Sequence, residues 1–231
     1  MDPTTINTNL QDMLLDDRRE RIEEVVAQRT RSLAVVLEDL EDPHNIAAVL
    51  RSCEAFGIQE VHAITRNFAF HPNPKITQGA EKWLDLSLYR EPERCLSILK
   101  QRGYLLAATH LSDDAISLFD LPIDRPVALV FGTEKTGVTP EMVSRCDVRF
   151  KIPMLGFSQS FNISVATAIC LSHLVFKRLE KLGKTGDLPP AEQQAMREKF
   201  FSLAIKQRHR IFQPKAQPKR QKNPGDEPSK P

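Results

Sequence analysis

Six short apolar runs, separated by helix-like stretches, occupy the middle of the chain and constrain its fold more than any other feature. The runs are bounded by polar residues, glycines or prolines, as short buried strands are. Parallel strands need helical crossovers, so the alternation predicts an α/β fold with a mainly parallel sheet flanked by helices. We expect strands at Leu33–Leu37, Glu60–Ile64, Leu84–Tyr89, Tyr104–Thr109, Val127–Phe131 and Val148–Pro153.

The helix-like stretches carry their own end signals. Glycine is favoured just after a helix, and Gly57, Gly103 and Gly183 each follow an apolar-periodic segment. We expect helices at Asn45–Phe56, Glu91–Arg102, Asn162–Leu182 and Ala191–Lys206.

The length and composition of the chain fit one sizeable core with appendages. With 231 residues and 41% hydrophobic side chains, one main domain is expected. Its apolar pattern begins at residue 33 and ends at the linker after residue 182. The predicted organisation is an N-terminal helical extension (1–32), a main domain (33–182), a C-terminal helical extension (183–210) and a disordered basic tail (211–231).

The net charge of +2 indicates no particular partner, but the charges are unevenly distributed. From Lys206 onward there are eight Lys or Arg residues against Asp226 and Glu227. A basic end of this kind favours contact with nucleic acid, although a solubilising disordered extension has the same composition.

The cysteines and the apolar runs indicate the cellular compartment in which the protein is expected. Cys53, Cys95, Cys146 and Cys170 are widely spaced and form no CxxC or Cys/His cluster, so we expect reduced thiols and no metal. No apolar run approaches the length of a membrane span, and the N-terminus lacks the order of a signal peptide. A soluble, cytoplasmic protein is expected.

The stretch "ALVFGTEKTGVTPEM" (128–142) suggests a phosphate-binding loop but lacks its pattern. A P-loop places Lys and Ser/Thr directly after its second glycine, whereas Gly137 is followed by Val138. A strand-to-helix turn with Thr139 as N-cap and Pro140 at the first helical position explains the end of the stretch. The polar insert Thr133–Lys135 is not explained in this way.

Two further polar stretches follow expected strands, where open α/β sheets bind ligands. In "DPHNIAAVLRSCEAFG" (42–57), Asn45 could be a helix cap, and Arg51 could be solvated or paired with Glu54. In "IPMLGFSQSFNISVATAICL" (152–171), Ser160 or Asn162 could cap the long helix. A cap does not explain five small or polar residues crowded between two apolar segments.

Together these three stretches resemble the SPOUT superfamily of RNA methyltransferases, in particular its TrmH branch. The first matches through Asn45 and Arg51, and the second through Gly132, Glu134 and Gly137. "THLSDDA" (109–115) is also similar to the TrmH branch. The third stretch matches through Ile152, Pro153, Gly156, Ser160, Asn162, Ser164 and Ala166.

The resemblance covers roughly residues 33–180 and implies a fold, a cofactor and a substrate. It implies a SPOUT fold with a C-terminal deep trefoil knot over about 127–179, which periodicity alone would not suggest. It also implies a homodimer that transfers a methyl group from S-adenosylmethionine to a ribose 2′-hydroxyl of RNA. The D-loop guanosine at position 18 of tRNA is the favoured target. The alternatives are ribosomal RNA, another tRNA position, or a non-catalytic RNA-binding protein of the same fold.

Residue roles follow from the same resemblance. Arg51 is implied as the activating residue, and since a guanidinium stays protonated we expect it to stabilise the developing 2′-alkoxide. Asn45, Glu134, Ser160 and Asn162 complete the implied catalytic set. Groups at Thr109, Gly132, Ile152, Leu155, Ser160 and Asn162 are implied to bind the cofactor.

RNA contacts are expected from both ends of the chain, since phosphate binding needs Lys and Arg. The acidic residues around the N-terminal arginines are equally typical of a solvated, salt-bridged helix. His110, at the end of an expected strand, is more typical of a structural histidine. The RNA-binding candidates are Arg18, Arg19, Lys206, Arg208 and Arg210.

Overall fold

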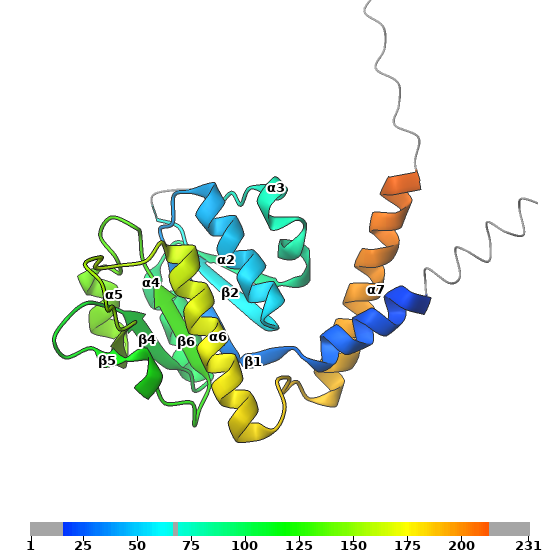
Figure 1. The fold of residues 1–231 in the computed structure, drawn as a ribbon. Helices are drawn as coiled ribbons and strands as arrows, with labels where there is room; N and C mark the ends of the chain where they lie inside the picture. The colour runs from blue at the N-terminus through cyan, green and yellow to red at the C-terminus, as the bar shows by residue number, and fades with distance from the viewer. Residues whose placement is uncertain (1–15, 67–68, 213–231) are drawn as a thin grey trace, which may run out of the picture.

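The protein folds around one seven-stranded, fully parallel sheet (Figure 1). The computed structural model describes residues 16–66 and 69–212, and only the backbone of residues 74 and 206–212. The strand order is β3-β2-β1-β6-β4-β7-β5. The strands are β1 (Thr30–Glu38), β2 (Ile58–Ile64), β3 (Asp85–Tyr89), β4 (Leu105–Thr109), β5 (Ile116–Ser117), β6 (Val127–Phe131) and β7 (Val148–Lys151).

All six expected strands and the predicted parallel sheet are confirmed; Val127–Phe131 has the predicted ends, and each of the other five strands is shifted at one end or both. The sequence did not indicate β5, because two residues that pair only with β7 are too short to show a period. The central strands read as continuous apolar runs since helices cover both faces of the sheet.

The helices are α2 (Pro43–Ala55), α3 (Pro74–Thr77), α4 (Pro92–Gln101), α5 (Pro140–Arg145), α6 (Ile163–Leu182) and α7 (Pro190–Phe212). Short 3-10 turns lie at Ala80–Trp83 and Leu118–Asp120. Successive side chains of a strand point to opposite faces. Leu33, Val35 and Leu37 of β1 therefore join the core under α2 and α6, while Ala34 and Val36 join the core under α4 and α5.

The helix starts follow local chemistry. The predicted caps Thr139 of α5 and Asn162 of α6 are confirmed. The expectation that Asn45 caps α2 is wrong. Asp42 is the cap, accepting a 2.8 Å hydrogen bond from the His44 amide, and Pro43 takes the first helical position because its φ is already helical. Asn45 therefore lies inside the first turns of α2, with its side chain available for another contact.

The two ends of the described chain pack together at one side of the molecule (Figure 1). Ile22 and Val26 of the N-terminal helix (residues 16–27) share an apolar cluster with Met196 and Phe200 of α7. Trp83 meets the Phe200 ring edge-on, with ring centroids 5.0 Å apart. The N-terminal helix is thus more than a solvated, salt-bridged helix, although it does carry the Arg21–Glu24 ion pair.

Some expectations are not tested by this structure. The domain boundaries and the trefoil knot stay predictions. The tail predicted from residue 211 lies, beyond Phe212, outside the described residues. Within the described part of the chain, no helix is long and apolar enough to cross a membrane. The four cysteines are free thiols, and burial raises the pKa of Cys53, Cys95 and Cys170 to about 12, so these thiols are unreactive.

Candidate functional site

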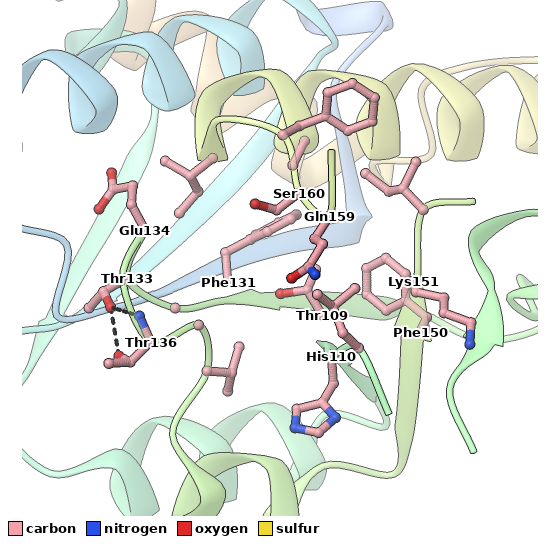
Figure 2. A pocket seen from close by; sticks show the side chains of 18 of the residues that line it. Thr109, His110, Phe131, Thr133, Glu134, Thr136, Phe150, Lys151, Gln159 and Ser160 are labelled. Atoms are coloured by element: carbon pink, nitrogen blue, oxygen red, sulfur yellow. Dashed lines mark hydrogen bonds between the residues drawn. The ribbon is translucent and has the colours of Figure 1, made fainter. Parts of the chain in front are cut away.

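A cavity of about 500 Å³ lies at the carboxyl ends of β4, β6 and β7 (Figure 2). Its wall includes the last residues of those strands, Thr109, Phe131 and Lys151, and the loops that follow them. This is the edge at which open parallel sheets bind ligands, and the volume is in the usual range for small molecules. The three polar stretches 42–57, 128–142 and 152–171 are called the first, second and third motifs below. The second and third motifs both contribute to the cavity wall.

The second motif forms a tight hairpin on the cavity wall. Thr133 and Gly137 exchange two backbone hydrogen bonds, of 3.1 and 2.9 Å, and the Thr136 amide donates to Thr133 Oγ1 at 3.1 Å. Because three of its amides bond within the loop, the hairpin does not offer them to a phosphate as a P-loop does. This explains the polar insert that a simple turn left unexplained.

Gly132 is required by a close backbone approach. A Cβ atom at this position would lie 2.0 Å from the Gly137 carbonyl oxygen, far inside van der Waals contact. Gly137 itself has a φ of +69°, in the left-handed region that favours glycine. The two glycines that the motif pattern singled out therefore close the hairpin.

One residue from each motif meets in a hydrogen-bonded chain beside the cavity. Asn162 Nδ2 donates to Asn45 Oδ1 at 3.1 Å, and Asn45 Nδ2 donates to Glu134 Oε1 at 2.5 Å. The three residues come from the start of α6, the first turns of α2 and the hairpin after β6. The three sequence stretches therefore meet at these residues.

The cap of α6 fixes the direction of this chain. Asn162 Oδ1 accepts from the Ser164 amide at 2.9 Å and from Ser164 Oγ at 2.6 Å. Its amide nitrogen therefore faces Asn45, whose own nitrogen must then face the carboxylate of Glu134. Each amide has one compatible orientation, so the three side chains are positioned before any ligand binds.

The residues implied to bind the cofactor divide into three groups. Thr109, Gly132, Ile152 and Ser160 line the cavity, as does Glu134. Asn162 lies outside the lining and reaches it through Asn45 and Glu134. Leu155 is not among the lining residues, and its side chain is fully exposed. The expected cofactor contact at Leu155 is through its backbone, and it stays a prediction.

Arg51 lies on α2 away from the cavity lining, with an exposed side chain. The alternative pairing with Glu54 is wrong, because Glu54 Oε1 accepts from the buried Arg29 Nη2 at 2.7 Å. Within residues 16–66 and 69–205, Arg51 makes no hydrogen bond or ion pair. Its guanidinium is available to a partner.

Sequence reasoning missed part of the cavity wall. Phe161 and Gln159 line it from the loop before α6, and Lys135 lines it from the hairpin. His110 also lines it, and among the described residues its Nδ1 and the Oγ of Ser112 are buried without a hydrogen-bond partner. Gln159 stood inside the crowded polar stretch, so that crowding was the signal that could have identified it.

The expected RNA-binding residues belong to the N-terminal helix and to α7, outside the cavity lining. Arg18 and Arg19 are exposed on the N-terminal helix, and the Arg18 guanidinium lies 5.9 Å from the centroid of the Trp83 ring. Lys206, Arg208 and Arg210 belong to α7, but their side chains lie outside the described residues. Across the part of the chain that the structure describes, no cluster of three or more His, Cys, Asp or Glu could hold a metal ion.

Comparison with known proteins gives a consistent answer. The SpoU rRNA Methylase family matches residues 32–172. A tRNA (guanosine(18)-2′-O)-methyltransferase of Borreliella burgdorferi is 37% identical over 85% of this chain and 90% of its own. The enzyme of the same description from Thermus thermophilus is 39% identical over 71% of this chain and 84% of its own.

The fold agrees with these sequence relationships. The crystal structure of the A. aeolicus TrmH/SpoU tRNA-modifying enzyme matches with a TM-score of 0.76 at 32% identity, covering 83% of this chain and 98% of that one. The resemblance inferred from the three motifs is thereby confirmed. The chain belongs to the SpoU rRNA methylase family.

Proposed function

We propose that this protein transfers a methyl group from S-adenosylmethionine to the ribose 2′-hydroxyl of the D-loop guanosine at position 18 of tRNA. The observation that carries the proposal is the Asn162–Asn45–Glu134 chain, in which one residue of each motif meets beside a ligand-sized cavity. The two relatives of this description reported above match over 90% and 84% of their own length, which favours tRNA over ribosomal RNA.

The cavity has the properties that S-adenosylmethionine needs. Phe131, Phe150 and Ile152 offer apolar surface to an adenine ring, and the unpartnered His110 Nδ1 and Ser112 Oγ offer polar contacts. Thr109, Gly132, Ile152 and Ser160 would hold the cofactor through backbone and hydroxyl groups. When bound, this cofactor supplies an electrophilic methyl group on a sulfonium.

The hydrogen-bonded chain would act on the ribose. A methyl transfer by in-line displacement needs the acceptor oxygen held against the methyl carbon, and preset side chains provide that positioning. Asn45 and Asn162 are preset by their mutual bond, and the exposed face of Glu134 can accept from a ribose hydroxyl. Ser160, on the cavity wall, would contact the ribose or the cofactor.

Arg51 would stabilise the negative charge that develops on the 2′-oxygen, because its guanidinium stays protonated and cannot act as the base. The hydroxyl proton passes to an RNA phosphate oxygen or to water. Arg51 does not line the cavity of its own chain. Either the bound RNA brings the ribose and Arg51 together, or the Arg51 of a second copy of the protein acts at this cavity.

A second copy also suits the surface beside the cavity. Leu155 and Phe157 are fully exposed, and Phe161 and Val165 are 42% and 45% exposed. Adjoining apolar side chains of this size mark an interaction surface, and a polyanionic RNA does not match them. We therefore propose a homodimer formed by the knotted region, in the cytoplasm.

RNA contacts beyond the target would come from the terminal extensions. Arg18 and Arg19 are exposed on a helix that α7 holds in place, and α7 leads to Lys206, Arg208 and Arg210. Such phosphate contacts give affinity without reading sequence.

The deciding experiment measures methyl transfer from labelled S-adenosylmethionine to unmodified tRNA transcript. It compares the wild type with Arg51→Ala and with Arg94→Ala, the control, which removes another exposed helical arginine, on α4. The expected product is a 2′-O-methylguanosine in the D-loop that is lost in Arg51→Ala and kept in Arg94→Ala. A wild type that binds the cofactor but methylates only ribosomal RNA would overturn the tRNA assignment.

A further inference from the structure

A buried carboxylate joins two of the motif segments from behind the site. Glu38 is the last residue of β1 and is 1% exposed. Its Oε1 accepts from Thr139 Oγ1 at 2.6 Å, and its Oε2 accepts from the Thr139 amide at 2.9 Å. Arg66 Nη2 also donates to Oε1. A carboxyl group that accepts from three donors, two of them on one residue, fixes that residue tightly.

Arg66 extends the same network to the turn after β1. Its amide donates to Asp39 Oδ1 at 2.7 Å and its Nε to Asp39 Oδ2 at 3.0 Å. Asp39 has a φ of +49°, a left-handed conformation that costs a non-glycine residue free energy. The hydrogen bonds from Arg66 stabilise this turn, which sends the chain from β1 through the buried Leu40 to α2.

The two connections lead to the two ends of the Asn45–Glu134 contact. Thr139 closes the segment that begins at Gly132 and carries Glu134, so its bonds to Glu38 fix one end of the hairpin. The Asp39 turn sets where α2 begins and hence where Asn45 lies. Glu38 is the residue directly before Asp39 in the chain, and it is hydrogen-bonded to Thr139.

We propose that Glu38 is a positioning residue for the methyl transfer, setting the register between Asn45 and Glu134 through Thr139 and the Arg66–Asp39 turn. It does not touch the cavity, and it acts only through those residues. The kinetic part of this inference rests on the proposed function, whereas its structural part does not.

The chain contains a comparison network at the opposite end of β1, around a carboxylate that is 18% exposed where Glu38 is 1% exposed. Asp187 accepts from Thr30 Oγ1 at 2.7 Å, from the Arg31 amide at 3.1 Å and from Arg178 Nη2 at 2.8 Å. The donors are a threonine hydroxyl, a backbone amide and an arginine, the same three types that surround Glu38. The nine-residue strand β1 runs from Thr30 in one network to Glu38 in the other, a distance on the order of 25 Å at the usual rise per residue.

The experiment compares Glu38→Gln with Asp187→Asn in the full-length protein. Both substitutions remove one charge from a satisfied network, so both should lower the melting temperature. At saturating tRNA and S-adenosylmethionine, only Glu38→Gln should lower kcat, by about 10- to 100-fold, since small misplacements of reacting groups have effects of that size. Binding of S-adenosylhomocysteine should change less than about threefold in either variant. The tRNA must be saturating because Asp187 lies close to the start of α7, which is proposed to contact RNA, so Asp187→Asn could weaken tRNA binding without changing kcat.

A second pair of variants tests the Thr139 hydroxyl, and their melting temperatures are measured beside kcat because this hydroxyl also caps α5. Thr139→Ser keeps the hydroxyl that bonds Glu38 and should retain kcat, while Thr139→Val loses the hydroxyl and should lower kcat as Glu38→Gln does. Equal kcat losses in Glu38→Gln and Asp187→Asn would show that lost stability is the cause and overturn the proposal.

A readout without RNA tests the structural step alone. The side-chain amide NMR signals of Asn45 report its bond to Glu134, and they should shift in Glu38→Gln but not in Asp187→Asn. If these signals shift while the wild type fails to methylate any tRNA, the proposed function fails. The structural part of the inference, that Glu38 sets the register between Asn45 and Glu134, then stands. Unshifted signals in Glu38→Gln would overturn the positioning role whatever the substrate.

Discussion

Asn45 and Asn162, 117 residues apart in the sequence, are joined by a 3.1 Å hydrogen bond in which each amide has one possible orientation. The bond exists because Asp42 caps α2 and so leaves the Asn45 side chain unoccupied, while Asn162 caps α6 with its oxygen alone. Local helix chemistry at both starts thus leaves one amide group on each helix to meet the other. The same pairing aims the Asn45 nitrogen at Glu134.

Replacing Asn45 should therefore affect the reaction more than cofactor binding. Asn45→Asp places a carboxylate against Glu134 and should lower kcat by about 100-fold, more than Asn45→Ala does, because like charges repel at this distance. Steady-state kinetics with tRNA and calorimetry with S-adenosylhomocysteine check the two effects. Equal losses of kcat in Asn45→Asp and Asn45→Ala would show that charge repulsion with Glu134 does not contribute.

Gly132→Ala should disrupt the hairpin and the cavity together. The new Cβ would meet the Gly137 carbonyl, so we expect unfolding to become easier by about 3 kcal/mol and S-adenosylhomocysteine binding to be lost. Gly103→Ala is the control, since Gly103 has a positive φ of 79°, unlike Gly132, but has open space around it and lies just after the C-terminal end of α4. That variant should lose only about 1 kcal/mol and bind normally. Chemical denaturation and calorimetry distinguish the two.

The sequence predicted the elements whose signals are local and missed features that depend on the assembled fold. Strand runs, the caps Thr139 and Asn162, and the paired glycines each depend on residues close in sequence. The Asn45 cap failed because Pro43 and Asp42 satisfy the helix start better. Phe161 lies in the cavity wall because of the path of the loop before α6, and hydrophobic periodicity does not predict the path of a loop. The packing of α7 on the N-terminal helix joins segments about 170 residues apart and has no sequence signature either.

Acid should destabilise the protein through Glu60. Burial alone would raise the pKa of this carboxyl, but the His62 ring, with Nε2 3.6 Å from Glu60 Oε2, the hydrogen bond and charge of Arg102, and the charge of Arg31 hold its pKa at about 2. A depressed folded-state pKa gives stability that is present above the unfolded value of about 4.5 and lost as pH falls toward 2. Urea unfolding between pH 6 and roughly pH 2.5 should show this decline.

Glu60→Gln provides the comparison for that measurement. The amide does not titrate, so the variant should be less stable than the wild type at neutral pH and should lose less stability on acidification. An identical pH dependence in both proteins would show that other carboxylates cause the acid sensitivity.

The exposed apolar surface beside the cavity should determine the oligomeric state. Phe157 is fully exposed in the single chain, so Phe157→Asp would place a charge in the proposed dimer interface and should yield monomers. Leu88→Asp is the control, because Leu88 is 57% exposed on β3, the edge strand remote from the cavity. Sedimentation velocity should show a wild-type and Leu88→Asp dimer and a Phe157→Asp monomer. Because Arg51 lies outside its own chain's cavity, a Phe157→Asp monomer that keeps full methyl-transfer activity would show that no second copy supplies the arginine, and that the bound RNA alone brings Arg51 to the ribose.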